Sequence, residues 1–282
     1  DEKTLIIACE EGEVEYDIPA LEKENASVEF IENEEDLNYE TLLHLHQKYQ
    51  PTQVMIEYNG MWDNTKFVDE ICIDQWQVVQ ILTTISAETF DLYYNNMRGQ
   101  FVYHITGSDL VIVNRCDENT KKYPIRGSIK SLNPMCQIVY ENKNRQIEDL
   151  TVNDLPYNLN DDYIEVNDMD YGIFCMHIME NPQIYENKTI KIKGKVIGRD
   201  KLIENGFVLG RQAMVCCSDD MQLLGLVCIS KYAKDLIKDE WLVVDGTISL
   251  EYDESIQSNI PILHVDHLEG AKPLENEYVT FD

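Results

Sequence analysis

Apolar runs alternate with amphipathic stretches along the first half of the chain. The runs are rich in Val, Ile and Leu, as is typical of strands covered on both faces, and the stretches between them have helical spacing. Asn38 can cap a helix that ends near Tyr49, and Ser86 can cap another over residues 87–98. This alternation predicts a layered, mainly parallel α/β sheet. The predicted strands are residues 4–9, 28–31, 54–58, 77–85, 110–113 and 137–140, and a further helix is predicted around residues 125–132.

The second half of the chain has a different pattern. From about Glu141 to Asp170, Asp, Asn and Glu dominate and hydrophobic periodicity is weak, which indicates a partly ordered linker. Beyond Tyr171, short alternating β runs with glycines at the bends predict a small β-barrel, for which an OB-like arrangement is one option. The predicted organisation is an α/β domain over residues 1–145, an acidic linker over 146–170 and a β-rich domain over 171–282.

The net charge of the chain limits the classes of molecule that it can bind. The 282 residues include 23 Lys and Arg against 52 Asp and Glu, a formal net charge of −29 that repels nucleic acid and anionic membranes. No apolar run approaches the roughly 18 residues that a membrane span needs, and the chain opens without a signal peptide. The eight cysteines form no C-x-x-C pair, which favours buried thiols. We therefore expect a cytoplasmic protein that is not embedded in a membrane and does not bind nucleic acid.

A carboxylate and a glycine stand at the end of the predicted strand 54–58. Glu57 and Gly60 form an E-x-x-G pattern, in which the carboxylate suits a metal-bound water and the glycine N–H can approach a phosphate. An ordinary turn after a strand is the alternative reading of such a pattern.

The predicted strand 110–113 is followed directly by Asn114-Arg115-Cys116-Asp117, which has the spacing of the guanine-reading N-K-x-D motif. An aspartate can accept hydrogen bonds from both the ring N–H and the exocyclic amine of guanine, whereas adenine lacks this donor pair. Arg115 keeps a long stem that can pack on the base, but its head group differs from that of lysine. The alternative is that Asn114 and Asp117 cap the next helix.

Taken together, four segments in order resemble the CobW-type P-loop GTPases, a metallochaperone group related to the hydrogenase and urease nickel GTPases. They are residues 9–17, 56–60, 114–117 and 131–134, and the resemblance covers about residues 4–141. Residues 171–282 resemble a C-terminal domain attached to some CobW-type proteins and similar to one in soluble subunits of permease-type proteins. The marks of this second resemblance are residues 207–211, 213–219 and 241–246 and the closing Pro273-Leu-Glu-Asn-Glu-Tyr-Val.

The resemblance implies the sheet of a P-loop GTPase and a role in metal homeostasis, with GTP and Mg²⁺ as cofactors. It implies that Glu57 holds Mg²⁺ through water, that Gly60 N–H faces the γ-phosphate, and that Glu10 and Asp17 lie in a switch loop. Nucleotide binding would then depend on Mg²⁺. The β-rich domain would contact a protein or metal-delivery partner, of which a membrane permease is one kind. The implied base-reading residues are Asn114, Arg115 and Asp117.

Two departures limit this implication. The sequence contains no G-x-x-x-x-G-K-[ST] phosphate loop, and residues 26–36 have no cysteine where the family has C-x-C-C. GTP, Mg²⁺ and hydrolysis are therefore expected only if a segment before residue 1 supplies the loop. For these 282 residues alone we expect no measurable GTPase activity. The alternative function is a non-catalytic interaction scaffold with a degenerate GTPase-like domain. Cys216 and Cys217 are expected to be buried or half-buried thiols, since neighbours on a strand point to opposite faces.

Overall fold

The computed structural model describes residues 3–10, 12, 14–200, 203–214, 221–254, 256–279 and 281. The chain forms two compact units. Unit 1 consists of Asp1–Ile85, Leu92–Ile112 and Met135–Gln137, and unit 2 of Ser86–Asp91, Val113–Pro134 and Ile138–Asp282.

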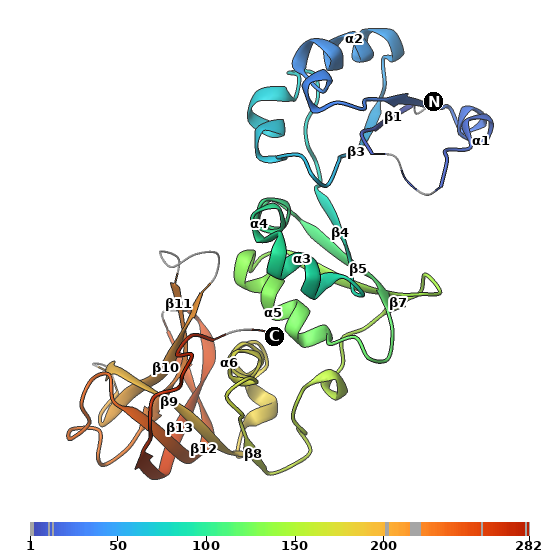
Figure 1. Cartoon of the computed structure of the whole chain (residues 1–282). Coiled ribbons are helices and arrows are strands. Elements are labelled where there is room, and N and C mark those ends of the chain that lie inside the picture. The colour runs from blue at the N-terminus through green and yellow to red at the C-terminus, as the bar shows by residue number, and fades with distance from the viewer. Residues whose placement is uncertain are drawn as a thin grey trace. The chain divides into compact units, whose positions relative to one another are not determined.

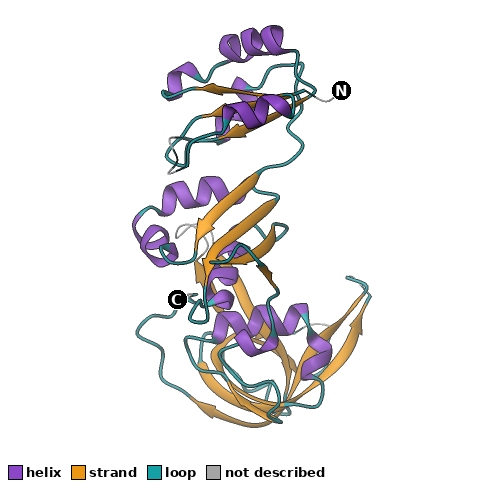
Figure 2. Ribbon diagram, turned by 90° about the vertical axis from the view of Figure 1, so that its right-hand side faces the viewer, coloured by secondary structure: helices purple, strands orange, loops and turns teal. Residues whose placement is uncertain are grey.

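Unit 1 contains a three-stranded parallel sheet with β1 in the centre, in the order β2-β1-β3. Buried Leu5 and Ile7 of β1 pack in one cluster with Leu42 and Leu45 of helix α2. The predicted cap of that helix is confirmed, because the Asn38 side chain accepts a hydrogen bond from Thr41 N–H. Figure 2 shows helices beside these strands. The elements are β1 (Thr4–Ala8), α1 (Ile18–Lys23), β2 (Ala26–Phe30), η1 (Glu34–Asp36), α2 (Tyr39–Tyr49), β3 (Gln53–Glu57) and the π-helix η2 (Phe67–Ile71).

A second sheet has the strand order β4-β5-β6-β7. The helix predicted over residues 87–98 begins only at Phe90, and the Ser86 hydroxyl, expected to cap it, is buried without a hydrogen-bond partner among the described residues. The elements of this region are β4 (Leu82–Ser86), α3 (Phe90–Asn96), α4 (Arg98–Thr106), β5 (Leu110–Cys116), α5 (Lys122–Leu132), β6 (Gln137–Asn142) and β7 (Ile147–Glu148).

The prediction that residues 1–145 form the layered, mainly parallel sheet of a P-loop GTPase is wrong. The part of the chain that the structure describes has two small sheets there instead. Strand β3 lies at the edge of its sheet, and its Met55 side chain is 54% exposed. The strand predicted over residues 77–85 begins only at Leu82. Val79, which lies before it, is 86% exposed. Apolar runs identified most of the strands, but a local pattern does not determine which strands become neighbours.

The C-terminal part of unit 2 is a β-barrel, as predicted for this part of the chain. Five strands follow one another in the order β10-β11-β13-β12-β9, and pairing of β10 with β9 closes the ring. The β11–β13 pair is parallel and the other pairs are antiparallel, which is the arrangement of an OB-like Greek-key barrel. The strands are β8 (Tyr163–Glu165), which adds to β9, then β9 (Thr189–Arg199), β10 (Gly206–Met214), β11 (Met221–Ile229), β12 (Trp241–Asp253) and β13 (Ser258–Gly270).

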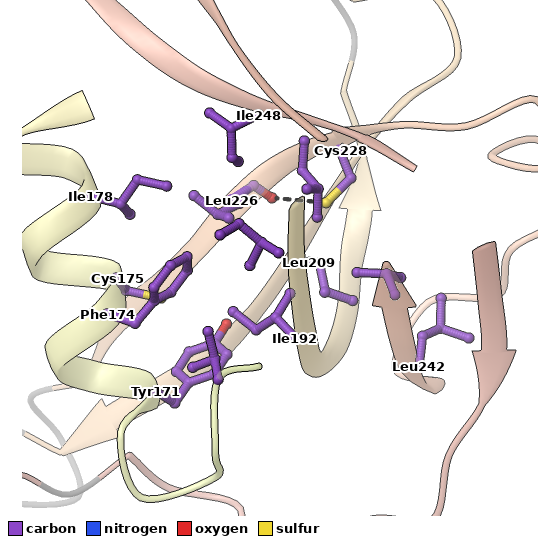
Figure 3. Packing of buried hydrophobic residues seen from close by; sticks show 14 of the residues in the cluster. Tyr171, Phe174, Cys175, Ile178, Ile192, Leu209, Leu226, Cys228, Leu242 and Ile248 are labelled. Atoms are coloured by element: carbon purple, nitrogen blue, oxygen red, sulfur yellow. Dashed lines mark hydrogen bonds between the residues drawn. The ribbon is translucent and has the colours of Figure 1, made fainter. Parts of the chain in front are cut away.

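A helix that the sequence pattern did not reveal, α6 (Tyr171–Glu180), packs against the barrel. Tyr171, Phe174, Cys175 and Ile178 of this helix point toward barrel side chains that include Leu209 (Figure 3). The helix is apolar on nearly all sides, so it has no amphipathic periodicity to recognise. Short 3-10 helices η3 (Val152–Asp154) and η4 (Pro182–Tyr185) precede and follow it.

A buried histidine lies beside this core. His177 of α6 is 5% exposed, and its Nδ1 lies 2.7 Å from the Tyr185 hydroxyl, which in turn lies 2.7 Å from the Tyr157 hydroxyl. Burial holds the pKa of His177 below its ordinary value, and the nearby Arg126 guanidinium also lowers it, whereas Glu180 opposes the shift. The buried ring is therefore neutral at neutral pH.

We expect this histidine to make unit 2 less stable in mild acid. Its folded pKa lies below its unfolded pKa, so the unfolded chain binds the proton more tightly, and stability is lost as the pH falls below the unfolded value of about 6.5. Urea unfolding at about pH 7.5 and about pH 5.5 should show a smaller loss for His177→Gln than for the wild type, because glutamine does not titrate. Parallel losses in the two proteins would contradict the assignment.

Candidate functional site

The carboxyl ends of β1 and β3 lie side by side in unit 1 (Figure 1), since the strands are parallel and Ala8 pairs with Glu57. Cys9 N–H donates to the Glu57 carbonyl at 2.9 Å. The Tyr16 hydroxyl donates to Glu57 Oε2 at 2.5 Å. One oxygen of the carboxylate assigned to the Mg²⁺ shell is thus held by a phenol, and its role toward Mg²⁺ stays a prediction.

Gly60 lies at the same end of the sheet. Its N–H donates to Glu10 Oε2 at 3.3 Å, and its carbonyl lies 3.0 Å from His104 Nε2. The Asn59 amide donates to the Cys9 carbonyl at 3.2 Å and so ties the two strand ends together. The structure therefore brings Glu10, Glu57 and Gly60 close together. The Gly60 N–H faces a carboxylate, an anion in the position expected for phosphate.

The Cys9 thiol and the Tyr16 phenol near Glu57 both have raised pKa values. Burial, with a further contribution from the Glu57 carboxylate, raises the pKa of the Cys9 thiol to about 11. Burial and the hydrogen bond to Glu57 raise the pKa of Tyr16 to about 12. Both groups therefore keep their protons at neutral pH, and the Tyr16 hydroxyl remains a hydrogen-bond donor to the Glu57 carboxylate.

Asp17, the other predicted switch-loop residue, caps helix α1. Its Oδ1 accepts a hydrogen bond from Ala20 N–H at 3.1 Å. Its role in nucleotide binding stays a prediction. Glu11 and Glu13 of the same acidic loop lie outside the described residues.

The predicted guanine motif lies at the end of β5 in unit 2. Ala87 N–H donates to the Asn114 carbonyl at 2.9 Å, while the Asn114 amide oxygen Oδ1 is buried without a hydrogen-bond partner among the described residues. Arg115 is exposed and has a φ of 57°, in the left-handed region that few non-glycine residues occupy. The buried oxygen and the left-handed residue beside it each call for an explanation, and together they make this loop a candidate site.

Asp117 closes a turn and carries an ion pair. Its Oδ1 accepts from Asn119 N–H at 3.0 Å and from the Thr120 hydroxyl at 3.4 Å, and its Oδ2 accepts from Lys143 Nζ at 3.1 Å. Lys143 also pairs with Glu88 at 2.9 Å. The hydrogen bond from Lys143, followed by that from Asn119 N–H, holds the pKa of Asp117 below its ordinary value. The carboxylate is therefore charged over the whole neutral range.

The alternative that Asn114 and Asp117 cap the following helix is wrong. Helix α5 begins after Lys121, and the Lys121 side chain makes no cap hydrogen bond. The contacts of Asp117 instead close the turn over residues 117–120.

No group of three or more His, Cys, Asp or Glu side chains that could hold a metal ion occurs in the described ranges. Cys216 and Cys217 lie outside those ranges. His264 Nε2 lies 2.8 Å from the Ser249 hydroxyl. A hard, oxygen-liganded metal at Glu57 stays a prediction.

Four further residues at these two sites escaped the sequence reasoning. Tyr16 and His104 contact the Glu57–Gly60 segment from distant parts of the chain, and Lys143 reaches Asp117 across 26 residues. Asn59 lies within the E-x-x-G pattern itself. An asparagine next to a glycine is typical of a turn, and this local signal could have identified it.

Residues 141–280 match the family described as "DUF1980 C-terminal domain". The C-terminal part of the chain is related to that family. UPF0703 protein YcgQ of Bacillus subtilis is 23% identical over 116 residues, which are 41% of this chain and 41% of that protein. The chain thus matches about two fifths of the relative's length. The prediction that residues 171–282 resemble a known C-terminal domain is confirmed in this coarse form, while the likeness to CobW-type proteins stays a prediction. The family match also takes in residues of the predicted acidic linker.

Solved structures similar to part of the chain include the N-terminal domain of PriB protein from Thermoanaerobacter tencongensis. It is 12% identical with a TM-score of 0.22, over 31% of this chain and 99% of that one. The mitochondrial single-stranded DNA binding protein Rim1 of S. cerevisiae is 11% identical with a TM-score of 0.22, over 30% of this chain and 94% of that one. Scores this low carry no argument. None of the described helices has both the length and the apolar character that a membrane span requires.

Proposed function

We propose that this chain contacts a guanine base through the loop after β5. The observation that carries the proposal is the Asp117 carboxylate, which is charged, 39% exposed and held in place by a turn. A carboxylate has about four acceptor positions. The hydrogen bonds from Asn119, Thr120 and Lys143 use three of them. A guanine edge would take the remaining position and the one that Lys143 occupies.

Lys143 can give up this position without being left unpaired. It is 51% exposed and retains its ion pair with Glu88 when it leaves Asp117. Asn114 lies three positions before Asp117, and its amide oxygen, buried without a hydrogen-bond partner among the described residues, would accept a contact from the base only when binding uncovers it. Bidentate contact to a charged acceptor discriminates guanine from adenine, which lacks the donor pair.

The wider function proposed is that of a guanine-nucleotide-binding protein of the CobW-like metallochaperone type, which acts in metal homeostasis in the cytoplasm. For Glu57 and Gly60 of unit 1, a role toward Mg²⁺ and phosphate stays a separate prediction. The DUF1980-related barrel would contact a protein or metal-delivery partner, and a membrane permease is one such partner. The likeness of residues 4–141 to the CobW-type motifs supports this proposal.

The test is base discrimination by these 282 residues, measured by nuclear magnetic resonance titration with GDP and with ADP. We expect binding no tighter than millimolar, because base contacts alone barely offset an association cost of at least about 4 kcal/mol. GDP should shift the amide signals of residues 114–120, while ADP at the same concentration should not. Equal responses would contradict the role of Asp117, and micromolar GTP binding would mean that the described residues supply a phosphate site.

A second candidate is a non-catalytic interaction scaffold, which a different observation favours. The Gly60 N–H is already bonded to Glu10, so the group expected to meet phosphate has an internal partner. If this reading is right, Glu10→Gln should leave GDP binding unchanged. If Gly60 meets phosphate, the same variant should bind GDP more tightly than the wild type, because a negative charge is removed from the site.

A further inference from the structure

An asparagine followed directly by a glycine is a chemically reactive pair. The glycine main-chain nitrogen can attack the carbonyl carbon of the asparagine side chain, and glycine has no side chain to obstruct this approach. The pair occurs twice in the sequence, at Asn59-Gly60 and at Asn205-Gly206. The first pair lies in the turn after β3, which Trp62 N–H closes on the Asn59 carbonyl at 3.0 Å. The chain thus carries the same reactive pair in two different surroundings.

The attacking nitrogen of the first pair has a carboxylate beside it. Gly60 N–H donates to Glu10 Oε2 at 3.3 Å. A carboxylate within reach of a proton can accept it as a general base, and such contacts are often long before the reaction begins. Gly60 is exposed, and a Cβ atom there would meet no atom of the described residues within 4 Å. Water can therefore reach the pair.

The side chain that is attacked is held by two further contacts. Asn59 Oδ1 accepts a hydrogen bond from Met61 N–H at 2.9 Å. Attack places negative charge on this oxygen, and a fixed main-chain N–H stabilises a developing oxyanion. The Asn59 amide nitrogen Nδ2, which becomes the leaving group, donates to the Cys9 carbonyl at 3.2 Å. Hydrogen bonds thus position the nucleophile, the carbonyl oxygen and the leaving group within one turn.

The second pair is held by different contacts. Gly206 N–H donates to the Ile203 carbonyl at 3.0 Å, and a neutral carbonyl is not a base for this proton. Gly206 is also the first residue of β10 and pairs with Ile229 of β11. It is buried, and a Cβ atom there would lie 2.9 Å from the Ile203 carbonyl oxygen. The strand therefore restricts the movement that ring closure at Asn205 needs.

We propose that Asn59-Gly60 is a site of spontaneous deamidation, at which the chain converts its own asparagine into aspartate and isoaspartate with Glu10 as the proton acceptor. The nitrogen of Gly60 bonds to Asn59 Cγ while Glu10 takes the proton from that nitrogen. The Cγ–Nδ2 bond then breaks, and the proton accepted by Glu10 passes through solvent to Nδ2, which leaves as ammonia. Water opens the resulting cyclic imide at either carbonyl, to aspartate or to isoaspartate.

The product changes the ends of two strands in unit 1. Aspartate at position 59 has no amide donor, so the contact with the Cys9 carbonyl is lost and a further carboxylate lies near Glu10. Isoaspartate carries the main chain through the Cβ atom of residue 59, which moves the Gly60 N–H from its present position. The modification therefore removes a contact between the ends of β1 and β3.

The test follows both Asn-Gly pairs in the full chain at neutral pH. Peptide mass spectrometry detects the replacement of NH₂ by OH, and isoaspartyl methyltransferase identifies isoaspartate. Asn59 should react about tenfold or more faster than Asn205, because a general base and an oxyanion donor assist the first pair. In the chain unfolded by guanidinium chloride the two pairs should react at similar rates. A folded chain in which Asn59 reacts no faster than Asn205, or yields aspartate without isoaspartate, would overturn the proposal.

The variant Glu10→Gln separates the base from the rest of the turn. Glutamine keeps an acceptor oxygen for Gly60 N–H but is not a base, so the rate at Asn59 should fall by about tenfold while that at Asn205 stays the same. Glu32→Gln removes the same charge from an exposed position of unit 1 and should change neither rate. Circular dichroism checks that each variant is folded. An unchanged or raised rate at Asn59 in folded Glu10→Gln would show that Glu10 does not accept the proton, and the proposal would fail.

Discussion

Replacing Arg211 with alanine is expected to lower the free energy of unfolding of unit 2 by about 3 kcal/mol. The guanidinium is 2% exposed and lies 4.2 Å above the Tyr171 ring. It donates to the Lys193 carbonyl at 2.7 Å and pairs with Asp168 at 2.5 Å. Alanine would leave the carbonyl without this donor and open a cavity beside Tyr171. Asp168 is 47% exposed, so water can solvate its carboxylate and the loss falls in the lower part of the usual range of about 3–5 kcal/mol.

Two further substitutions of positively charged residues serve as controls. Arg211→Lys keeps the positive charge but loses the planar fork, so an intermediate loss is expected. Lys238→Ala removes an exposed positive charge from the loop before β12 of the same barrel and should cost less than about 0.5 kcal/mol. Urea denaturation monitored by circular dichroism measures all three. An Arg211→Ala protein within about 1 kcal/mol of the wild type would show that the guanidinium does not hold the barrel to Asp168.

The sequence predicted individual strands far better than their arrangement. The run Thr4–Ala8 is β1 in full, because a continuous apolar stretch needs cover on both faces wherever it lies. The neighbours of β3 and β4 depend on contacts between distant parts of the chain, which periodicity does not encode. The position of β3 at the edge of its sheet, which leaves Met55 exposed, depends on such contacts. The resemblance to P-loop GTPases implied one layered sheet for these strands, and that arrangement is wrong.

The same limit applies to the candidate sites. Glu57, Gly60 and Asp117 were chosen as candidates because each stands at or just after the end of a strand at a recognisable spacing. Their partners were not found, because tertiary packing brings Tyr16 to Glu57 and Lys143 to Asp117.

Replacing Asp117 with asparagine is expected to change which base the chain prefers. The aspartate accepts from two donors of guanine, whereas asparagine offers one acceptor and one donor. Xanthine carries an oxygen in place of the exocyclic amine of guanine, so the asparagine amide can donate to it. Asparagine also keeps an oxygen for Asn119 N–H, so the turn over residues 117–120 is retained. The ratio of GDP affinity to XDP affinity should fall by about tenfold or more. The variant loses a hydrogen bond from guanine to a charged acceptor, and such bonds are stronger than those between neutral groups.

The ratio is the useful quantity because both affinities are weak in these 282 residues. Resonance titrations of wild type and Asp117→Asn with the two nucleotides determine it, and a change in phosphate contacts alters both affinities alike and cancels. Asp149→Asn is the matched control, since it removes the same charge from an exposed position and should leave the ratio unchanged. An unchanged ratio in Asp117→Asn would mean that the carboxylate does not meet the base. The contacts of Asp117 with Lys143 and Asn119 would then serve only to hold the loop between β5 and α5.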